Sequence, residues 1–195
     1  MSRKILIIQG HPDQSREHFC HALAAAYRSG AEGAGFEVDE LCLADMDIPV
    51  LKSEQEWNSE SLPADIAEAQ ARIRAADHLV FVFPLWLGTM PALVKAFLEQ
   101  IFRPGFAFPR GTKPGIGERL LKGKSARVVM TMGMPGLAFR WFFRAHGYRY
   151  FKRNILHFCG IRPVRADFIG MVAAPRPSLR AKWLARVEKS GRSGN

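Results

Sequence analysis

Short apolar runs spaced along this 195-residue chain are the feature that most restricts its fold. RKILIIQ (3–9), HLVFVF (78–83) and ARVVMT (126–131) have the length and apolar character of buried strands. A second, less buried strand is predicted at FEVDELCL (36–43), and a fifth at RPVRADFIG (162–170). A run that is apolar on both faces, as at 78–83, is typical of a central strand in a parallel sheet.

Helical periodicity fills most of the chain between these strands. The helices are predicted after the first strand, where Phe19, Leu23, Ala26 and Tyr27 share one face, and at about 63–76, 91–103, 138–158 and 178–189. The helix at 91–103 has two apolar stripes, so we expect one to contact the sheet and the other a second subunit. Residues 44–62 and the Pro/Gly-rich 103–117 are predicted to be surface loops.

Strands that alternate with helices predict right-handed crossovers and a doubly wound parallel sheet with helices on both faces. Five strands fit the flavodoxin-like order 2-1-3-4-5, in one α/β domain over residues 1–190 with a disordered tail at 191–195. Ligands of such sheets bind beyond the carboxyl ends of the strands. That rule marks three loops: the first corner (10–19), the second corner (84–91) and the third corner (131–136).

Composition narrows the class of protein. With 48% hydrophobic and 24% charged residues, the chain is typical of a globular protein. No apolar run reaches the roughly 20 residues of a membrane span, and the first ten residues lack a signal-peptide cleavage site, so we expect a cytoplasmic protein. Cys20, Cys42 and Cys159 are widely spaced without a C-x-x-C pair, which favours buried free thiols over disulfides or a metal site.

The net charge of +10 comes entirely from the second half of the chain. Residues 1–100 hold eight Lys/Arg and fifteen Asp/Glu, whereas residues 101–195 hold twenty and three. Such an excess of basic residues can bind nucleic acid, an anionic membrane surface or a phosphorylated cofactor. The asymmetry does not choose among these partners.

The first corner, GHPDQSREHF, lies where a helix begins. Free N–H groups and the positive end of the helix dipole favour an anion there, and Ser and His side chains add donors. The segment is neither a P-loop nor a G-x-G-x-x-G fingerprint, and a plain helix cap with surface histidines is the alternative interpretation. His18 and His21 are three residues apart, but the remaining histidines are scattered along the chain, so no metal site is expected.

The second and third corners complete a slot for a flat ring. FPLWLGTM offers Trp86 and Leu87 as an apolar wall, and its prolines are expected to leave the backbone groups of residues 85–88 free. TMGMPG offers glycine N–H groups that can approach a ligand closely. A heteroaromatic ring with a phosphate tail would fill such a slot.

These motifs resemble a known family. GHPD with its downstream Ser and Phe, FPLWLGTMPALVKAFLEQIF with GFAF, TMGMPG, and NILHFCGI are similar to the NAD(P)H:quinone oxidoreductases, flavodoxin-like flavoproteins that include DT-diaphorase and ancillary subunits of potassium efflux systems. The likeness covers about residues 4–170. It implies an FAD or FMN cofactor, NAD(P)H as co-substrate, a quinone-like acceptor and a homodimer.

The resemblance also assigns roles to residues at the three corners. It places the flavin phosphate at His11, Ser15, His18 and Phe19. It lines the flavin ring with Pro84, Leu85, Trp86, Leu87 and Gly88. It assigns hydrogen bonds to the ring's polar edge to Thr131, Met132 and Gly133.

The chain departs from the family pattern at three places. Phe19-Cys20 stands where Phe-Asn is usual, and Gly133-Met134 where Gly-Gly is usual. The family's Tyr and His that stabilise charge on the reduced flavin have no aligned equivalent, and His146 and Tyr148 are the nearest candidates. For Phe139, Trp141, Phe142 and Phe143 we expect packing on the sheet or on a partner subunit.

The implied activity is a ping-pong reaction in which NAD(P)H passes hydride to flavin N5 and a quinone or similar acceptor then takes the electrons. An ancillary flavoprotein of a membrane transporter is the first alternative, and the basic aromatic helix could also lie on a membrane surface. A nucleic-acid platform on FRWFFRAHGYRYFKR is a weaker alternative, since it leaves the three corners unexplained, and salt-sensitive binding would reveal it.

Overall fold

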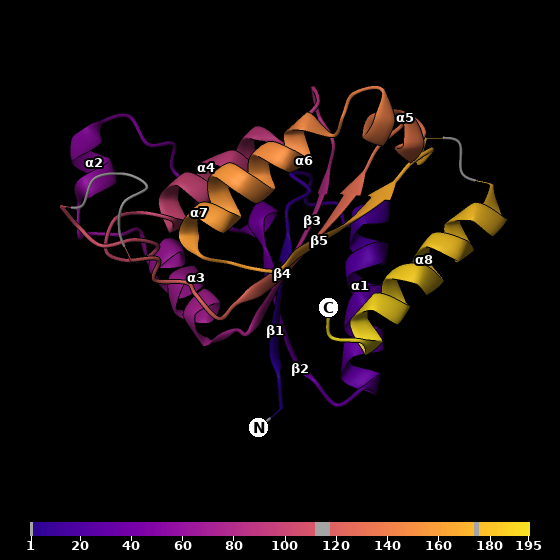
Figure 1. The fold of residues 1–195 in the computed structure, drawn as a ribbon, viewed down its shortest axis with the longest axis horizontal. Helices are drawn as coiled ribbons and strands as arrows, with labels where there is room; N and C mark the ends of the chain where they lie inside the picture. The colour runs from indigo at the N-terminus through magenta and orange to yellow at the C-terminus, as the bar shows by residue number, and fades with distance from the viewer. Residues whose placement is uncertain (1, 112–117, 174–175) are drawn as a thin grey trace.

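The structure is a computed structural model that describes residues 2–111, 118–173 and 176–195. Its centre is a five-stranded parallel sheet in the order β2-β1-β3-β4-β5, as predicted (Figure 1). The strands are β1 (Lys4–Gln9), β2 (Glu37–Cys42), β3 (His78–Pro84), β4 (Ser125–Thr131) and β5 (Val164–Ile169).

The sheet register explains the apolar runs. β3 lies between β1 and β4, with Ile7 opposite Val80 and Val80 opposite Arg127. Every residue of β3 and β4 is buried, because both strands have neighbours on each side and helices on each face. β2 forms an edge and alternates between exposed and half-buried positions over most of its length.

Helices cover both faces of the sheet (Figure 1). α1 (Phe19–Gly33) and α8 (Pro177–Arg192) pack together on one face, over a core that includes Ile5, Tyr27 and Val82. α3 (Ala64–Ala75), α4 (Ala92–Ile101) and the 146–159 helical region cover the other, over a core that includes Phe81, Phe97 and Phe151. The two faces therefore carry separate hydrophobic cores.

The segment between β2 and α3 has more structure than the predicted loop. A 3-10 turn, η1 (Leu43–Asp45), follows β2 and buries Leu43. α2 (Glu54–Asn58) is capped by Ser53, whose side chain accepts the N–H of Glu56 at 3.1 Å. Single-turn helices of this kind have no apolar periodicity to reveal them.

The aromatic region after β4 is divided into four pieces rather than one helix. They are α5 (Gly136–Trp141), α6 (His146–Tyr150), the π-helix η2 (Phe151–Leu156) and α7 (His157–Cys159). The break between α5 and α6 occurs at Arg144 and Ala145, which both have positive φ angles, 50° and 48°. Left-handed residues cannot continue a right-handed helix, so the chain changes direction there.

The two apolar stripes of α4 are both covered within the chain. Val94 and Leu98 are as buried as Phe97 and Ile101, and Leu93 is half-buried. The prediction that the second stripe contacts another subunit is therefore wrong, because α3 and the segment around η1 already pack against this helix.

The carboxyl end of the chain makes helical and side-chain contacts within the segment 191–195 that is predicted to be a disordered tail. α8 continues to Arg192, and Gly191 packs so tightly on α1 that an added Cβ would lie 2.1 Å from the Tyr27 carbonyl oxygen. Arg127 Nε donates a hydrogen bond to the carbonyl of Asn195. The polar composition of the tail conceals these contacts.

The loop after α4 is described only to residue 111, and residues 112–117 of the predicted loop lie outside the described residues. Its first part folds back on itself, since Gly105 N–H donates to the Phe108 carbonyl at 2.7 Å. In the described parts of the chain, every helix is too short or too polar to cross a membrane.

Candidate flavin site

The three corners meet at the carboxyl ends of β1, β3 and β4. Gly10 N–H donates to the Val82 carbonyl at 2.8 Å, and Leu85 N–H donates to the Thr131 carbonyl at 2.7 Å. Cys20 Sγ lies 3.2 Å from Thr131 Oγ1, which joins the start of α1 to the end of β4. Residues far apart in sequence are thus brought to one edge of the sheet, as the topology predicts.

Gly10 is required by close packing. A Cβ at this position would lie 2.6 Å from Val94 Cγ2 and 3.2 Å from Phe83 Cβ. A side chain here would push the first corner away from the second, so the glycine sets their spacing.

The first corner gathers three histidines. His11 is buried and stacks on His18, with ring centroids 3.7 Å apart and planes 16° apart. His21 lies 5.8 Å from His11 and 6.2 Å from His18 by centroids, and Trp86 meets His11 edge-on at 6.2 Å. The sequence-based view that the other histidines are scattered is wrong for His11, because the loop folds back over the start of α1.

Burial and the neighbouring imidazoles lower the pKa of His11 to about 4, so its ring is neutral at pH 7. Its Nδ1 accepts the N–H of Asp13 at 3.2 Å, which leaves the proton on Nε2. The His11 N–H itself donates to Gln9 Oε1 at 2.5 Å. The ring is therefore oriented with a donor available for a ligand.

The Asp13 carboxylate is hydrogen-bonded to two groups of the loop that were predicted to hold a phosphate. Its Oδ1 accepts the N–H of Ser15 at 2.8 Å, and its Oδ2 lies 2.8 Å from His18 Nε2. These hydrogen bonds lower the pKa of Asp13 to about 2. The carboxylate thus occupies, from within the chain, the place where an anionic ligand would bind to Ser15 and His18.

Phe19 begins α1 and packs toward α8, where the Arg180 guanidinium lies 4.7 Å from its ring centroid. Among the described residues, none caps the amino end of this helix, since the His18 side chain makes no capping hydrogen bond. The first N–H groups of an α-helix have no i−4 partner. In α1 the N–H of His21 donates to the His18 carbonyl at 2.9 Å, which leaves those of Phe19 and Cys20 for an anion.

The second corner is a tight turn rather than a free backbone. Trp86 N–H donates to the Thr89 carbonyl at 2.9 Å and Thr89 N–H donates back at 3.0 Å. Leu87 and Gly88 have φ angles of 46° and 82°, as in a type I′ turn. The expectation that prolines leave residues 85–88 free is wrong for Leu85 and Trp86, whose N–H groups are both bonded.

The turn displays apolar side chains at the edge of the site. Pro84 is buried and Leu85 is half-buried, whereas Trp86 is 49% exposed and Leu87 is fully exposed. A branched side chain at a positive φ angle is strained, and strain of this kind is retained where it serves binding. Trp86 and Leu87 therefore expose apolar side chains at the position where the apolar wall is predicted.

At the third corner, Gly133 is better placed for a ligand than its neighbours. Met132 is buried, its N–H donates to the Ile169 carbonyl at 2.9 Å, and its carbonyl accepts the Val172 N–H at 3.2 Å. Thr131 is engaged by Leu85 and Cys20. Gly133 is exposed, and an added Cβ would meet no described atom within 4 Å.

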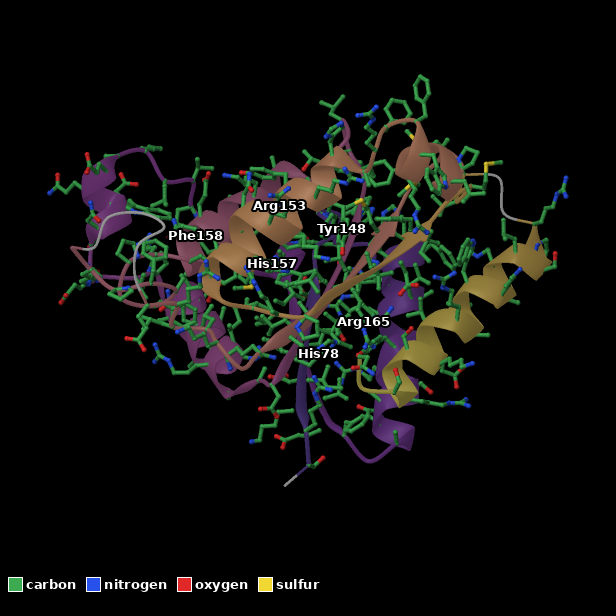
Figure 2. All side chains as sticks on the ribbon, in the orientation of Figure 1. His78, Tyr148, Arg153, His157, Phe158 and Arg165 are labelled. Atoms are coloured by element: carbon green, nitrogen blue, oxygen red, sulfur yellow. The ribbon has the colours of Figure 1, made fainter. Side chains whose placement is uncertain are left out.

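His146 and Tyr148 lie next to the second corner. Between them, Gly147 packs against the turn so closely that a Cβ would lie 2.1 Å from the Gly88 carbonyl oxygen. His146 is exposed at the start of α6. Tyr148 turns toward the sheet instead, as Figure 2 shows, and its hydroxyl donates to the Val164 carbonyl at 3.3 Å; burial raises its pKa. Of the two residues, only His146 therefore has a side chain exposed beside the second corner.

Sequence reasoning missed two polar groups behind the first corner. Gln9 Nε2 and both ring nitrogens of His21 are buried without a hydrogen-bond partner among the described residues. A polar residue at the end of an otherwise apolar strand was the available signal for Gln9. Buried polar atoms without partners indicate a missing ligand or water. Together with the first N–H groups of α1, they fit the phosphate and polar chain of a flavin.

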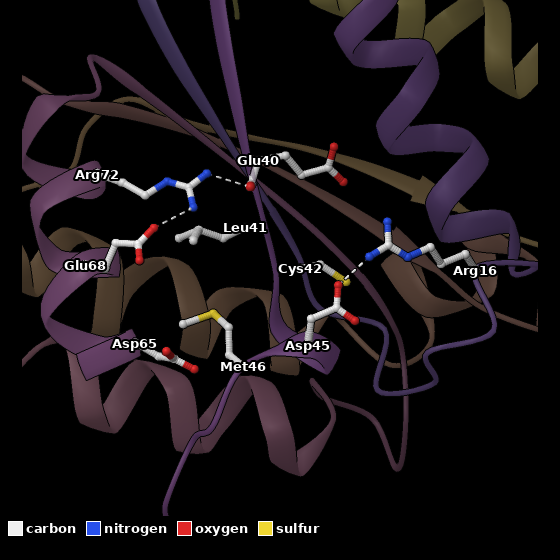
Figure 3. A pocket seen from close by; sticks show the side chains of 9 residues that line it. All are labelled: Arg16, Glu40, Leu41, Cys42, Asp45, Met46, Asp65, Glu68 and Arg72. Carbon is white, nitrogen blue, oxygen red and sulfur yellow. Dashed lines mark hydrogen bonds and ion pairs between the residues drawn. The ribbon is translucent and has the colours of Figure 1, made fainter. Parts of the chain in front are cut away.

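A separate pocket of about 370 Å³ lies beside the first corner (Figure 3). Its lining consists of Arg16, Glu40, Leu41, Cys42, Asp45, Met46, Asp65, Glu68 and Arg72. Arg16 pairs with Asp45, and Arg72 pairs with Glu68 and Asp39. Because its charges are satisfied within the chain, this pocket has less need of a ligand than the three corners.

The cysteines of this chain are free thiols, and the described acidic, histidine and cysteine side chains do not form a metal site. Within residues 2–111, 118–173 and 176–195, no group of three His, Cys, Asp or Glu side chains is arranged to hold a metal ion. Cys20 and Cys159 are buried and Cys42 is half-buried, all as free thiols. Burial raises the pKa of Cys20 to about 11 and that of Cys159 to about 12, so both are protonated at pH 7.

Comparison with known proteins gives matches over most of the chain. An FMN-dependent NADH:quinone oxidoreductase of Listeria innocua is 32% identical over 184 residues, with 85% of this chain and 86% of the relative covered. The human ribosyldihydronicotinamide dehydrogenase [quinone] is 29% identical over 147 residues, which are 71% of this chain and 62% of the relative. The chain therefore spans less than two thirds of that relative's length.

Solved structures show the same fold. A Streptococcus mutans protein, Smu.1420, superposes with a TM-score of 0.82 at 26% identity, covering 97% of this chain and 99% of the other. The NAD(P)H:quinone oxidoreductase of Methanothermobacter marburgensis also gives 0.82, at 24% identity, with 99% and 97% covered.

The family described as Flavodoxin-like fold matches residues 3–190, and the sheet order agrees with it. The chain belongs to the flavodoxin-like fold family, and its relatives include proteins named FMN-dependent NADH:quinone oxidoreductase and ribosyldihydronicotinamide dehydrogenase [quinone].

Proposed function

We propose that this protein is a flavin-dependent NAD(P)H oxidoreductase that reduces a quinone-like acceptor. The observation that carries the proposal is the meeting of the three corners, which places an apolar wall, an open glycine and unpaired polar atoms at one edge of the sheet. The homologues with quinone reductase names support the same activity. A cytoplasmic location belongs to this proposal as well.

FMN is the flavin that we propose. The Listeria innocua relative is named as FMN-dependent, and a Bacillus anthracis azoreductase of the same fold is described in complex with FMN. The donors described above suit one phosphate: the ring of His11, the N–H groups at the start of α1, and the orphan amide of Gln9.

When bound, the flavin supplies the redox chemistry, taking a hydride from NAD(P)H and giving electrons to the acceptor. The chain's own residues position the reactants. Trp86 and Leu87 exclude water from one side of the site, and the Gly133 N–H is free to stabilise negative charge that develops at the ligand's edge. His146, exposed beside the turn, is the proposed proton-bearing group.

A homodimer is also part of the proposal. α5 and the region after it expose Leu137, Trp141, Phe142 and Phe143, at 69%, 73%, 81% and 48%. α5 lies at the same end of the molecule as the carboxyl ends of β3, β4 and β5 (Figure 1). Phe139, in contrast, is buried against Phe168. A second copy that covers the exposed aromatic side chains would enclose the site.

One observation favours an ancillary role in a transporter. A 76-residue stretch is 40% identical to the potassium-efflux ancillary protein KefG of Cronobacter sakazakii, although this stretch is only 39% of the chain. The catalytic proposal explains the whole chain and is the one we adopt.

The test is a visible spectrum of the FMN-loaded protein before and after anaerobic addition of NADPH or NADH. We expect the flavin bands to bleach within seconds and to return when a quinone is added. Bound flavin that does not bleach with either nucleotide would replace the catalytic proposal with the ancillary one. Failure to bind FMN or FAD would overturn both.

A further inference from the structure

A second pocket lies between the 49–63 segment and the end of α4, and it includes none of the residues assigned to the flavin. Its volume is about 660 Å³, within the range of small-molecule sites. Polar groups on its wall come from Lys52, Glu56, Ser59, Ser61, Gln100 and Arg103. Figure 1 shows α2, which belongs to this segment, at the opposite end of the molecule from α8.

Arg103 is buried in this wall without a direct ion pair among the described residues. Only 4% of its surface is exposed. Glu56, the nearby acid, favours the charged form of Arg103 only through space. It donates to Gln100 Oε1, and Gln100 Nε2 donates in turn to the Pro49 carbonyl at 2.6 Å. The contact to the Ser61 carbonyl is long, at 3.5 Å, and Nε has no partner among the described residues.

A guanidinium in this position is costly to the fold. It keeps its charge at all physiological pH values, although burial lowers its pKa. A buried charge that is not paired destabilises a protein by several kcal/mol. Neutral carbonyl and amide partners hold the Arg103 group in place but do not neutralise it.

The surroundings add a second cation and hydroxyl groups. Lys52 lines the same pocket, and Ser59 and Ser61 contribute hydroxyls. Glu56 is the acid on the wall. Its Oε2 accepts the backbone N–H of Lys52 at 2.9 Å, and its charge partly offsets that of Arg103 without a direct ion pair. Two cations face one carboxylate, so the pocket retains positive charge.

We propose that this pocket binds a small organic oxyanion, a phosphate- or carboxylate-bearing molecule up to the size of a nucleotide, through Arg103 and Lys52. The planar fork of an arginine matches either group with two parallel hydrogen bonds. The remaining wall is apolar, from Pro49, Val50 and Pro63, and suits the carbon body of such a ligand.

The proposal is tested by thermal shift and calorimetric titration with inorganic phosphate, and separately with acetate, against sodium chloride at equal ionic strength. The FMN-saturated full chain is used, so that phosphate does not bind at the first corner, and the titration is repeated without flavin. We expect saturable binding of phosphate, acetate or both in each case, since the site does not depend on the flavin. The two anions distinguish the phosphate from the carboxylate source.

Three variants assign the binding. Arg103→Gln should weaken it about tenfold or more, because a charge-assisted pair is lost. It should also raise the melting temperature of the ligand-free protein, since the uncompensated charge is removed. Lys52→Gln, on an exposed side chain, should weaken binding about threefold without affecting folding. The matched control is Arg153→Gln, an exposed arginine of η2 that does not line this pocket.

Equal affinity of wild type, Arg103→Gln and Lys52→Gln would overturn the proposal, as would an effect that chloride reproduces. If Arg103→Gln does not fold, Arg103 has a structural role, and unchanged binding in Lys52→Gln would then overturn the proposal on its own. Loss of flavin binding alone would overturn the proposed oxidoreductase function and leave this one standing.

Discussion

His18 Nε2 lies 2.8 Å from Asp13 Oδ2. The Asp13 carboxylate is thus hydrogen-bonded to the imidazole that is expected to hold the flavin phosphate. The same carboxylate accepts the Ser15 N–H. This arrangement satisfies the loop without a ligand. It also sets a competition, since a phosphate and the Asp13 carboxylate require the same donors.

Asp13→Asn should therefore tighten FMN binding, by about threefold to tenfold, because it removes a negative charge beside the phosphate. Fluorescence quenching of FMN gives the dissociation constant. Glu17→Gln is the matched control: it removes a charge from the same loop, and its side chain makes no hydrogen bond among the described contacts. Weaker binding in Asp13→Asn would mean that the carboxylate orients the donors instead of competing for them.

Leu87→Asn should separate stability from activity. Leu87 is exposed at a φ of 46°, where asparagine is tolerated better. The substitution should raise the free energy of unfolding by about 0.5–1 kcal/mol and raise the KM for the quinone, because the apolar wall is lost. Urea unfolding and steady-state kinetics measure the two effects. A more stable variant with an unchanged KM would remove Leu87 from the acceptor site.

Gly147→Ala should displace the second corner. A Cβ there would lie 2.1 Å from the Gly88 carbonyl oxygen, so the turn or α6 must move. We expect a loss of about 1–3 kcal/mol of stability and a lower kcat. Gly33→Ala, in α1 where an added Cβ meets no described atom within 4 Å, should be neutral or stabilising. Equal stability of the two variants would show that the 2.1 Å contact relaxes without cost.

His78 should make the protein less stable in acid. Burial and the charges of Arg3, Arg127 and Arg165 lower its pKa to about 3 from 6.5. Figure 2 shows His78 and Arg165 at the lower part of the sheet, away from the corners. Between pH 6.5 and 3 the unfolded chain binds a proton that the folded chain does not, so stability falls as the pH falls.

His78→Asn removes this proton. The slope of unfolding free energy against pH near pH 5 should decrease by about 1.4 kcal/mol per pH unit relative to wild type. The two proteins should have parallel profiles above pH 7.5, where the histidine is neutral in both states. Urea titrations at several pH values measure the slopes. Identical slopes at pH 5 would show that His78 charges in the folded protein.

The exposed aromatic side chains of 137–143 should bind anionic membranes if they serve a surface-associated enzyme, because Arg140 and Arg144 lie among them. Replacing Trp141 and Phe142 with Ser should then abolish cosedimentation with vesicles that contain phosphatidylserine. Sedimentation velocity distinguishes a homodimer from a membrane-bound monomer. If a second copy covers this surface, the wild type is dimeric and does not bind vesicles, and the same variant becomes monomeric. A wild-type protein that is monomeric and does not bind vesicles would contradict both the homodimer and the membrane association.

The sequence by itself determined the sheet and the edge of it at which the candidate site lies. Runs such as 78–83 are apolar on both faces, and only a central parallel strand buries both. The order of strands and helices then fixed the carboxyl-edge corners at 10–19, 84–91 and 131–136, since crossover handedness leaves few alternatives. The helices predicted at about 63–76, 91–103 and 178–189 are found at 64–75, 92–101 and 177–192.

Only the tertiary structure decided which groups at those corners are available. Hydrogen bonds between residues distant in sequence engage Leu85 with Thr131, and Met132 with Ile169. Packing by α3 and η1 buries the second stripe of α4, and a hydrogen bond from Arg127 holds the carbonyl of Asn195; both segments look free in the sequence. The unpaired charge of Arg103 likewise exists only because the 49–63 segment folds over it. Local patterns report burial and periodicity, whereas the partner of a polar group depends on which distant residue the fold brings to it.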